Sequence, residues 1–292
     1  MLSDDYEHCI ENFLVHPQNT QRNYLFYVDP YGIKCLDFRY FERLKDIGFK
    51  SLEFLVNLNT SGFLREGCRL LKYTRELPDW TDDLDYEQDG KNSPAHMDDV
   101  AGGNYWRDIL TAFQAHDIDF YQAEDRFASE YTRRIRNVLP LVVHVAIRER
   151  SHQLPKYRLL FATNHRDGLF LMTNTMHKAW RTQLDREAGG QLTFFNDVQW
   201  PALPGQSIEE KIWAEVGDPI ELGKLLTVLI ERYGIAHSTS QYKTAIRTHE
   251  GKMFVVRRTP DKTPTGKQAH HMDYDDAQIM ISQLAYQQDW LR

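Results

Sequence analysis

The chain of 292 residues contains only three cysteines and no long run of apolar residues. The cysteines, Cys9, Cys35 and Cys68, are odd in number and far apart, which indicates reduced thiols and no zinc site. No run approaches the roughly 18 apolar residues that a bilayer crossing needs. The acidic start, Met1–Tyr6, lacks the apolar stretch of a signal peptide. We therefore expect a soluble cytoplasmic protein with no membrane partner.

An excess of positive charge is also missing, because the formal net charge is −7. This balance excludes a uniformly basic nucleic-acid binder but leaves room for a local basic surface. Three short motifs are absent as well: the P-loop, the Gly-x-Gly-x-x-Gly loop and the Gly-x-Ser-x-Gly elbow. The sequence is 41% hydrophobic and 26% charged, which is typical of an ordinary globular protein.

The first ordered pattern along the chain is that of a strand, a helix and a second strand. Tyr24–Val28 is a continuous apolar run, typical of a strand that is covered on both faces. Asp37 can cap a helix that Gly48 ends. Leu52–Leu58 is a second buried strand. These segments predict a parallel βαβ unit with a right-handed crossover.

The middle of the chain combines a polar segment with further helices and a hairpin. Residues from about 78 to 103 are rich in Asp, Glu, Gly and Pro and predict an acidic loop. The β-branched runs 138–147 and 157–163 predict an antiparallel hairpin. Apolar residues at helical spacing predict four helices, over 63–71, 106–113, 120–136 and 168–180.

The last part of the chain has the element order of a winged helix. Ser207-Ile208-Glu209-Glu210 resembles a helix start, although its carboxylates fall short of the usual third-position capping box. A closing helix is expected over Asp273–Trp290. The segments between are a helix over Ile220–Tyr233, a helix over Ser238–His249, a strand over Met253–Arg257 and a loop over Pro260–Thr265. We expect an α/β domain over residues 1–205 and a winged-helix-like region over 206–292.

The turn Asp29-Pro30-Tyr31-Gly32 follows the first strand and is the leading candidate for a binding site. Ligands of α/β folds bind at the carboxyl ends of parallel strands, where Asp29 would lie. Asp29 and the Pro30 carbonyl could accept hydrogen bonds from an amine, and the Tyr31 ring could stack on a base. Taken alone, these residues fit a strand-end turn without chemistry somewhat better.

Asn164 and His165 form a second candidate, after the second strand of the predicted hairpin. His165 could serve as a general base and Asn164 as a cap, but a capped loop is the better interpretation. His270-His271 with Asp273 and Asp275 could hold a metal, although a solvated linker is far more common and we expect no metal.

Lys243, Arg247, Arg257 and Arg258 belong to a set of cations in the winged-helix-like region that faces few carboxylates. On the second helix and the wing they would meet nucleic-acid phosphates. A solvated face that packs on the main domain explains the same residues equally well.

Several segments, in their order, resemble the bacterial three-Cys-motif partner proteins. They are Phe26–Gly32; Leu55–Asn59 with Arg65; Gly103–Trp106; and Tyr157–Leu169 with Met172 and Met176. The resemblance covers most of residues 5–180 and implies a class I methyltransferase-like fold. It also implies a partner, a radical-SAM-like protein that bears three cysteines.

The sequence departs from this family at its start. Family members begin with a further half that carries a strand ending in Asp-x-Phe-Ala-Gly-x-Gly, the loop expected to hold the methyl donor. Without it, the remaining strands would be the fourth, the fifth and the terminal antiparallel hairpin. We therefore expect no cofactor for this chain alone, and S-adenosylmethionine only if another chain supplies the missing half.

The departure predicts an exposed sheet edge at Tyr24–Val28. A second copy, a separate partner chain or the local segment Met1–Val15 could cover that edge. The favoured hypothesis is a truncated methyltransferase-like accessory protein that is not catalytic alone. The alternatives are an amine methyltransferase acting on a nucleobase, with its donor site completed by another chain, and a winged-helix nucleic-acid-binding module.

Overall fold

The computed structural model describes two compact units, one ending at His165 and one beginning at Arg166. The division falls before the helix that follows the hairpin, whereas the sequence-based domain boundary lies at residues 205 and 206. The described residues are 6–15, 20–29, 37–78, 93–148, 154–187, 206–263, 265–272 and 278–284.

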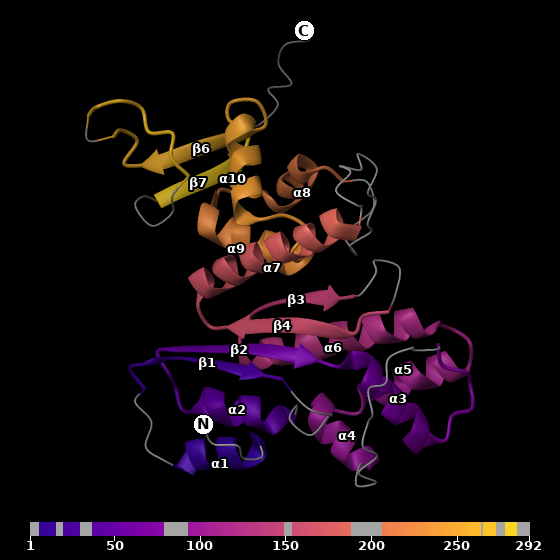
Figure 1. Ribbon diagram of the computed structural model, residues 1–292. Helices are drawn as coiled ribbons and strands as arrows, with labels where there is room; N and C mark the ends of the chain where they lie inside the picture. Colours follow the sequence, from indigo (N-terminus) through magenta and orange to yellow (C-terminus); the bar gives the residue numbers. More distant parts are fainter. Residues whose placement is uncertain are drawn as a thin grey trace. The chain divides into compact units, whose positions relative to one another are not determined.

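The first unit is built on a four-stranded mixed sheet (Figure 1). Its strands are β1 Asn23–Val28, β2 Ser51–Leu58, β3 Leu141–Ile147 and β4 Tyr157–Thr163. The order across the sheet is β1-β2-β4-β3. β1 and β2 are parallel, while β4 is antiparallel to both β2 and β3. The parallel pair and the hairpin predicted from the sequence are therefore confirmed.

Six helices are described in this unit. They are α1 Tyr6–Val15, α2 Phe38–Asp46, α3 Thr60–Leu71, α4 Pro94–Ala101, α5 Tyr105–Gln114 and α6 Phe120–Val138. Asp37 caps α2 as expected, accepting a hydrogen bond from the Arg39 amide at 2.9 Å. Gly48 follows α2 with a φ of +75°, a conformation that favours glycine.

Helix α4 corrects the prediction of an acidic loop over residues 78–103. Ser93 caps this helix by accepting from the His96 amide, and Pro94 occupies its first turn. Proline is favoured there because its missing amide hydrogen would have no partner in the helix. Gly102 ends the helix in the left-handed conformation. Residues 79–92 of the predicted loop lie outside the described residues.

Strand β1 is covered on one face only, which corrects the expectation of a strand buried on both. Tyr24 and Phe26 pack against Phe13 of α1, with ring centroids 5.6 and 5.3 Å apart. Leu25 and Tyr27 point the other way and are 57% and 58% exposed. β1 is also one of the two edge strands of the described sheet, the other being β3, so both its edge and one face are open within this unit.

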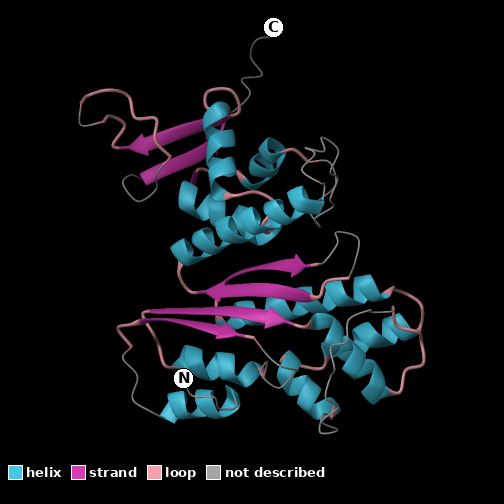
Figure 2. Ribbon diagram, in the orientation of Figure 1, coloured by secondary structure: helices cyan, strands magenta, loops and turns pink. Residues whose placement is uncertain are grey.

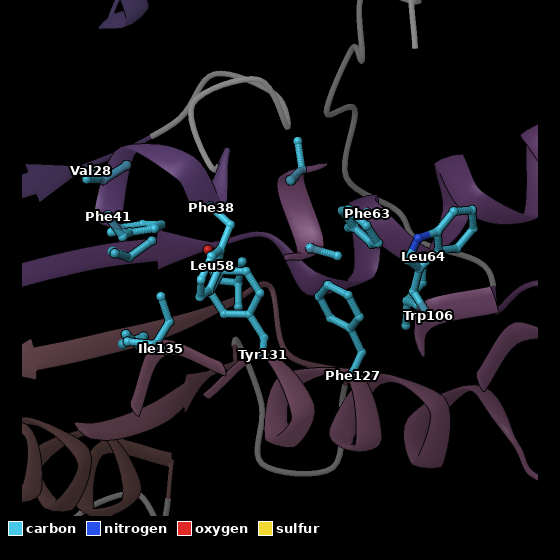
Figure 3. Packing of buried hydrophobic residues seen from close by; sticks show 14 of the residues in the cluster. Val28, Phe38, Phe41, Leu58, Phe63, Leu64, Trp106, Phe127, Tyr131 and Ile135 are labelled. Carbon is cyan, nitrogen blue, oxygen red and sulfur yellow. The ribbon is translucent and has the colours of Figure 1, made fainter. Parts of the chain in front are cut away.

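Aromatic side chains form the centre of the first unit's core (Figure 3). Phe63 of α3 stacks on Phe127 of α6 at 4.5 Å and meets Trp106 of α5 edge-on at 5.9 Å. Tyr131, one turn further along α6, packs against Phe38 of α2. All five are buried, so these rings hold four helices together beneath the sheet.

A buried ion pair joins this helical layer to the sheet. Arg158 of β4 donates to both carboxylate oxygens of Glu124 on α6, at 2.8 and 2.5 Å. Their side chains are 3% and 1% exposed. The Thr60 hydroxyl, at the start of α3, also donates to Glu124. Two helices and the central antiparallel strand thus share one carboxylate.

The second unit contains a three-stranded antiparallel sheet and four described helices (Figure 2). The elements are α7 Arg166–Glu187, α8 Ile208–Glu215, β5 Ile220–Glu221, α9 Leu222–Tyr233, α10 Thr239–Thr248, β6 Phe254–Thr259 and β7 Gln278–Gln283. The strand order is β5-β7-β6. None of the helices described in either unit combines the length and the apolar composition that a membrane crossing requires.

Two details of this unit differ from the sequence-based expectation. The closing helix expected over Asp273–Trp290 is wrong at residues 278–283, which form strand β7; residues 273–277 and 285–292 lie outside the described residues. Ser207 also makes a complete capping box, because Glu210 is the third residue of α8 and bonds back to the Ser207 amide.

Removing Arg158 should unfold the first unit more readily than removing an exposed arginine. Arg158→Ala leaves the Glu124 charge buried without its partner, and we expect a loss of about 3–5 kcal/mol in unfolding free energy. Arg133→Ala is the matched control, because Arg133 pairs with Glu130 on the exposed side of α6 and should cost below about 1 kcal/mol.

Urea unfolding followed by circular dichroism measures both changes. The double variant Arg158→Met/Glu124→Leu should recover most of the loss, because an apolar pair of similar volume carries no buried charge. Equal losses for Arg158→Ala and Arg133→Ala would contradict the structural role of the buried pair.

Candidate functional site

The candidate site lies where the parallel strands β1 and β2 end. Asp29 directly follows β1 and is exposed. Asn57, one residue before the end of β2, donates from its side-chain amide to Asp29 Oδ1 at 2.8 Å. The parallel pairing explains this contact. Val28 lies opposite Val56, so the following residues, Asp29 and Asn57, lie side by side at the carboxyl ends of the two strands.

Tyr27, one residue before the end of β1, adds a phenol to this cluster. Its pKa is raised from the ordinary value, first by partial burial and then by the charge of Asp29 and a hydrogen bond to it. Tyr27, Asp29 and Asn57 thus form a small exposed polar cluster of one carboxylate, one amide and one aromatic hydroxyl. Pro30 and Tyr31 of the sequence-based site lie outside the described residues.

The cluster can accept hydrogen bonds from a ligand but has little enclosure. Asn57 occupies Oδ1 of Asp29 from within the sheet, and an exposed carboxylate keeps further acceptor capacity. An amine could therefore bind to Asp29 from the solvent side. Asp29 and Tyr27 are both exposed, so walls that exclude water would have to come from residues beyond this cluster.

Asn164 and His165 do not belong to the same site as Asp29. The side-chain oxygen of Asn164 accepts from the Leu52 amide at 3.0 Å, at the start of β2. Leu52 and Asn57 are five residues apart on one strand, which corresponds to about 17 Å. The two candidates therefore lie near opposite ends of strand β2. Asn164 links the end of β4 to the start of β2 through its hydrogen bond with Leu52.

His165 is exposed, and its backbone amide donates to the Thr163 hydroxyl at 2.9 Å. This geometry is that of a turn capped by threonine. It fits the capped-loop interpretation that the sequence favoured.

The four cations expected to contact nucleic acid are in different environments. Arg258 is buried: its guanidinium donates to both oxygens of Glu250, at 2.6 and 2.9 Å, and to the His271 carbonyl at 2.9 Å. It cannot reach a phosphate, which corrects its assignment. Arg247, in the last turn of α10, and Arg257 on β6 are exposed, and Lys243 on α10 is half-buried.

Sequence reasoning missed a hollow of about 420 Å³ between α2, α4 and α6. Arg134 of α6 reaches across it, donating to the Gly102 carbonyl at 2.7 Å and covering the Tyr105 ring at 4.3 Å. Gly103 permits this approach, because a Cβ there would come within 3.0 Å of the guanidinium. The run Gly103–Trp106 was the available signal, but its neighbourhood was interpreted as a loop.

Two of the charged residues that line this hollow form ion pairs with residues beside it. Arg39 pairs with Asp37. Asp98 accepts from the Trp106 indole at 2.9 Å and from Arg107 at 2.5 Å. We therefore interpret the hollow as part of the packing between three helices.

Metal and thiol chemistry find little basis in the described residues. None of them forms a group of three or more His, Cys, Asp or Glu side chains that could hold a metal ion. Burial raises the pKa of the Cys68 thiol to about 11, so this cysteine is not a reactive thiolate at neutral pH. Asp273 and Asp275, considered with His270 and His271, lie outside the described residues.

The described geometry defines a mixed α/β protein of two units, with a mixed parallel and antiparallel sheet in the first. Comparisons with family models, with curated proteins and with solved structures found no match. A function for this chain must therefore be argued from its own residues.

Proposed function

We propose that this protein is a methyltransferase-like accessory protein that works as part of an assembly. The observation that carries the proposal is the strand order β1-β2-β4-β3 with β1 open at the edge. In a class I methyltransferase sheet, the fourth and fifth strands are parallel neighbours, and the seventh runs antiparallel between the fifth and the sixth. The directions and neighbours of the four strands here fit that pattern.

The open side of β1 supports association through this strand. β1 corresponds to the fourth strand of the complete fold. In that fold the first strand lies beside the fourth, at the edge that is open here. An unpaired strand with apolar side chains is a template for pairing with another chain. Leu25 and Tyr27 place such side chains on its uncovered face. The partner is a second copy or a separate chain, and the resemblance favours the three-Cys-motif protein.

The second unit supports the same family resemblance. Helix α8, strand β5, helices α9 and α10, and the ribbon of β6 and β7 follow the element order of a winged helix. The order β5-β7-β6, with β7 in the middle, is the one that this fold uses.

The proposed accessory protein does not catalyse methyl transfer by itself. The methyl donor of a class I methyltransferase rests on the ends of its first three strands, while the strands here correspond to the other four. Asp29 can hold an amine at the end of β1, but a donor beside it would come from another chain.

Two lysines on the open face of β1 should separate the assembly. We expect light scattering to give the wild type, alone or with the three-Cys-motif protein, a mass above the 34.4 kDa of one chain. Leu25→Lys/Tyr27→Lys should lower it to that of one chain, because lysines on an edge strand oppose pairing. Both positions are exposed, so the folding cost should stay within about 1 kcal/mol.

Tyr121→Lys is the matched control, because Tyr121 on α6 is 45% exposed and its charged neighbour Arg148 follows β3, the strand at the other edge of the sheet. It should leave the mass unchanged. A wild type that stays monomeric alone and gains no mass with the partner would contradict the proposal.

The second candidate function is an amine methyltransferase whose donor half comes from another chain, with Asp29, Pro30 and Tyr31 holding the acceptor base. The hydrogen bond from Asn57 to Asp29 favours it, because it fixes the carboxylate at the strand end.

Titration calorimetry with S-adenosylmethionine separates the two functions. The accessory role predicts no heat of binding for the purified chain, and binding by that chain would contradict it. For the split enzyme, we expect binding only in the assembly, with Asp29→Ala abolishing methyl transfer and leaving donor binding intact.

A further inference from the structure

We propose that the second unit binds duplex DNA through a surface formed by α10, β6 and the loop after β6. We call this the cation surface. It comprises Lys243, Arg247, Lys252, Arg257, Lys262 and Lys267.

The cation surface is poor in compensating negative charge. Helix α10 contains no Asp or Glu, and only Glu250 and Asp261 are acidic between Ser238 and Met272. From a neighbouring element, Glu209 of α8 lies 3.9 Å from His249 at the end of α10. Arg258 occupies both carboxylate oxygens of Glu250 and lowers the pKa of that carboxyl group. No described carboxylate pairs with Arg247 or Arg257. A positive patch thus persists on a protein whose net charge is −7.

A tight turn joins the end of α10 to β6. The Met253 and Phe254 amides both donate to the His249 carbonyl, at 2.9 and 3.2 Å. This turn carries the exposed Lys252 and directly follows Arg247. Arg257 lies three residues along β6 from Phe254, or about 10 Å. Helix, turn and strand therefore place three exposed cations within a short stretch of the chain.

Arg258 contributes by fixing the loop that follows β6. Its bond to the His271 carbonyl ties the end of that loop to the strand. Inside the loop, the Thr263 amide donates to the Lys267 carbonyl and the Ala269 amide to the Asp261 carbonyl, both at 2.8 Å. The loop thus holds Lys262 and Lys267 in a defined conformation, and the buried arginine acts as a positioning residue.

The outer face of α10 is suited to a groove. Tyr242, Ala245 and Ile246 are buried, while Ser240, Thr244 and Arg247 are exposed. The exposed residues are three and four positions apart and therefore share one face of the helix. This face is polar and carries a cation at its end.

The size of α10 favours DNA over RNA. An α-helix with its side chains is about 10–12 Å across, and the major groove of B-form DNA, about 12 Å wide, admits it. The major groove of duplex RNA is too narrow for side chains to read. Duplex DNA is therefore the occupant that we propose.

Fluorescence anisotropy of the full-length protein with a mixed-sequence duplex DNA tests the proposal. With about four phosphate contacts, binding should weaken about a hundredfold between about 50 and 200 mM salt. Arg247→Ala/Arg257→Ala should weaken binding at low salt at least about tenfold and reduce the salt slope by about two. Arg247→Lys/Arg257→Lys keeps both charges and should retain most of the affinity.

Lys178→Ala is the matched control, because it removes one exposed charge from α7, outside the cation surface. It should leave both affinity and slope nearly unchanged. No binding at low salt, binding without salt dependence, or equal loss in Lys178→Ala would overturn the proposal. Equal affinity for a duplex RNA of the same sequence would overturn the assignment to DNA.

Discussion

The buried pair between Glu124 and Arg158 is the interaction on which the first unit depends. Arg158 lies on β4, opposite Leu58 of β2 and Ala146 of β3. A shift of β4 by one residue would turn Arg158 to the other face of the sheet and leave Glu124 buried without a cation. The pair therefore fixes the register of β4 between its two neighbours.

Each unit leaves a surface of different chemistry uncovered. In the first, α1 covers one face of β1 through Phe13, while Leu25 and Tyr27 stay exposed. In the second, Glu250 is paired with Arg258 and does not offset the charges of Arg247 and Arg257. An apolar strand edge suits a protein partner, and a cationic helix suits a phosphate backbone. The proposed roles therefore rest on separate residues, and either can fail without the other.

The sequence predicted the elements whose local pattern is strong. The apolar runs of β1 to β4 and the caps at Asp37 and Gly48 suffice for their assignment. Helix α4 was missed although Ser93-Pro94 is a helix-start signal, because the surrounding composition is acidic. β7 was missed although Ile279 and Ile281 alternate with less buried residues, as in a strand with one face covered.

The candidate sites required contacts that no local pattern encodes. Asn164 and Asp29 were separate candidates because both follow strands, and only the antiparallel pairing of β4 with β2 shows that they lie at opposite ends of these strands. Arg258 and Arg257 are adjacent in the chain, and only the position of Glu250 makes one of them structural. Residue type and spacing thus identified the carboxylate and the cations, while the pairing of strands and charges determined which of them can meet a ligand.

Amide hydrogen exchange along β1, compared with β2, tests most directly whether the edge of this sheet is completed by another chain. Half of the β1 amides bond to β2 and the other half point outward, so pairing alone protects the outward set. In the assembled wild type we expect slow exchange at every residue of Asn23–Val28, and loss of protection at alternate residues in Leu25→Lys/Tyr27→Lys. Fast exchange of the outward amides in the wild type, at the rate seen in that variant, would contradict an assembly built on β1.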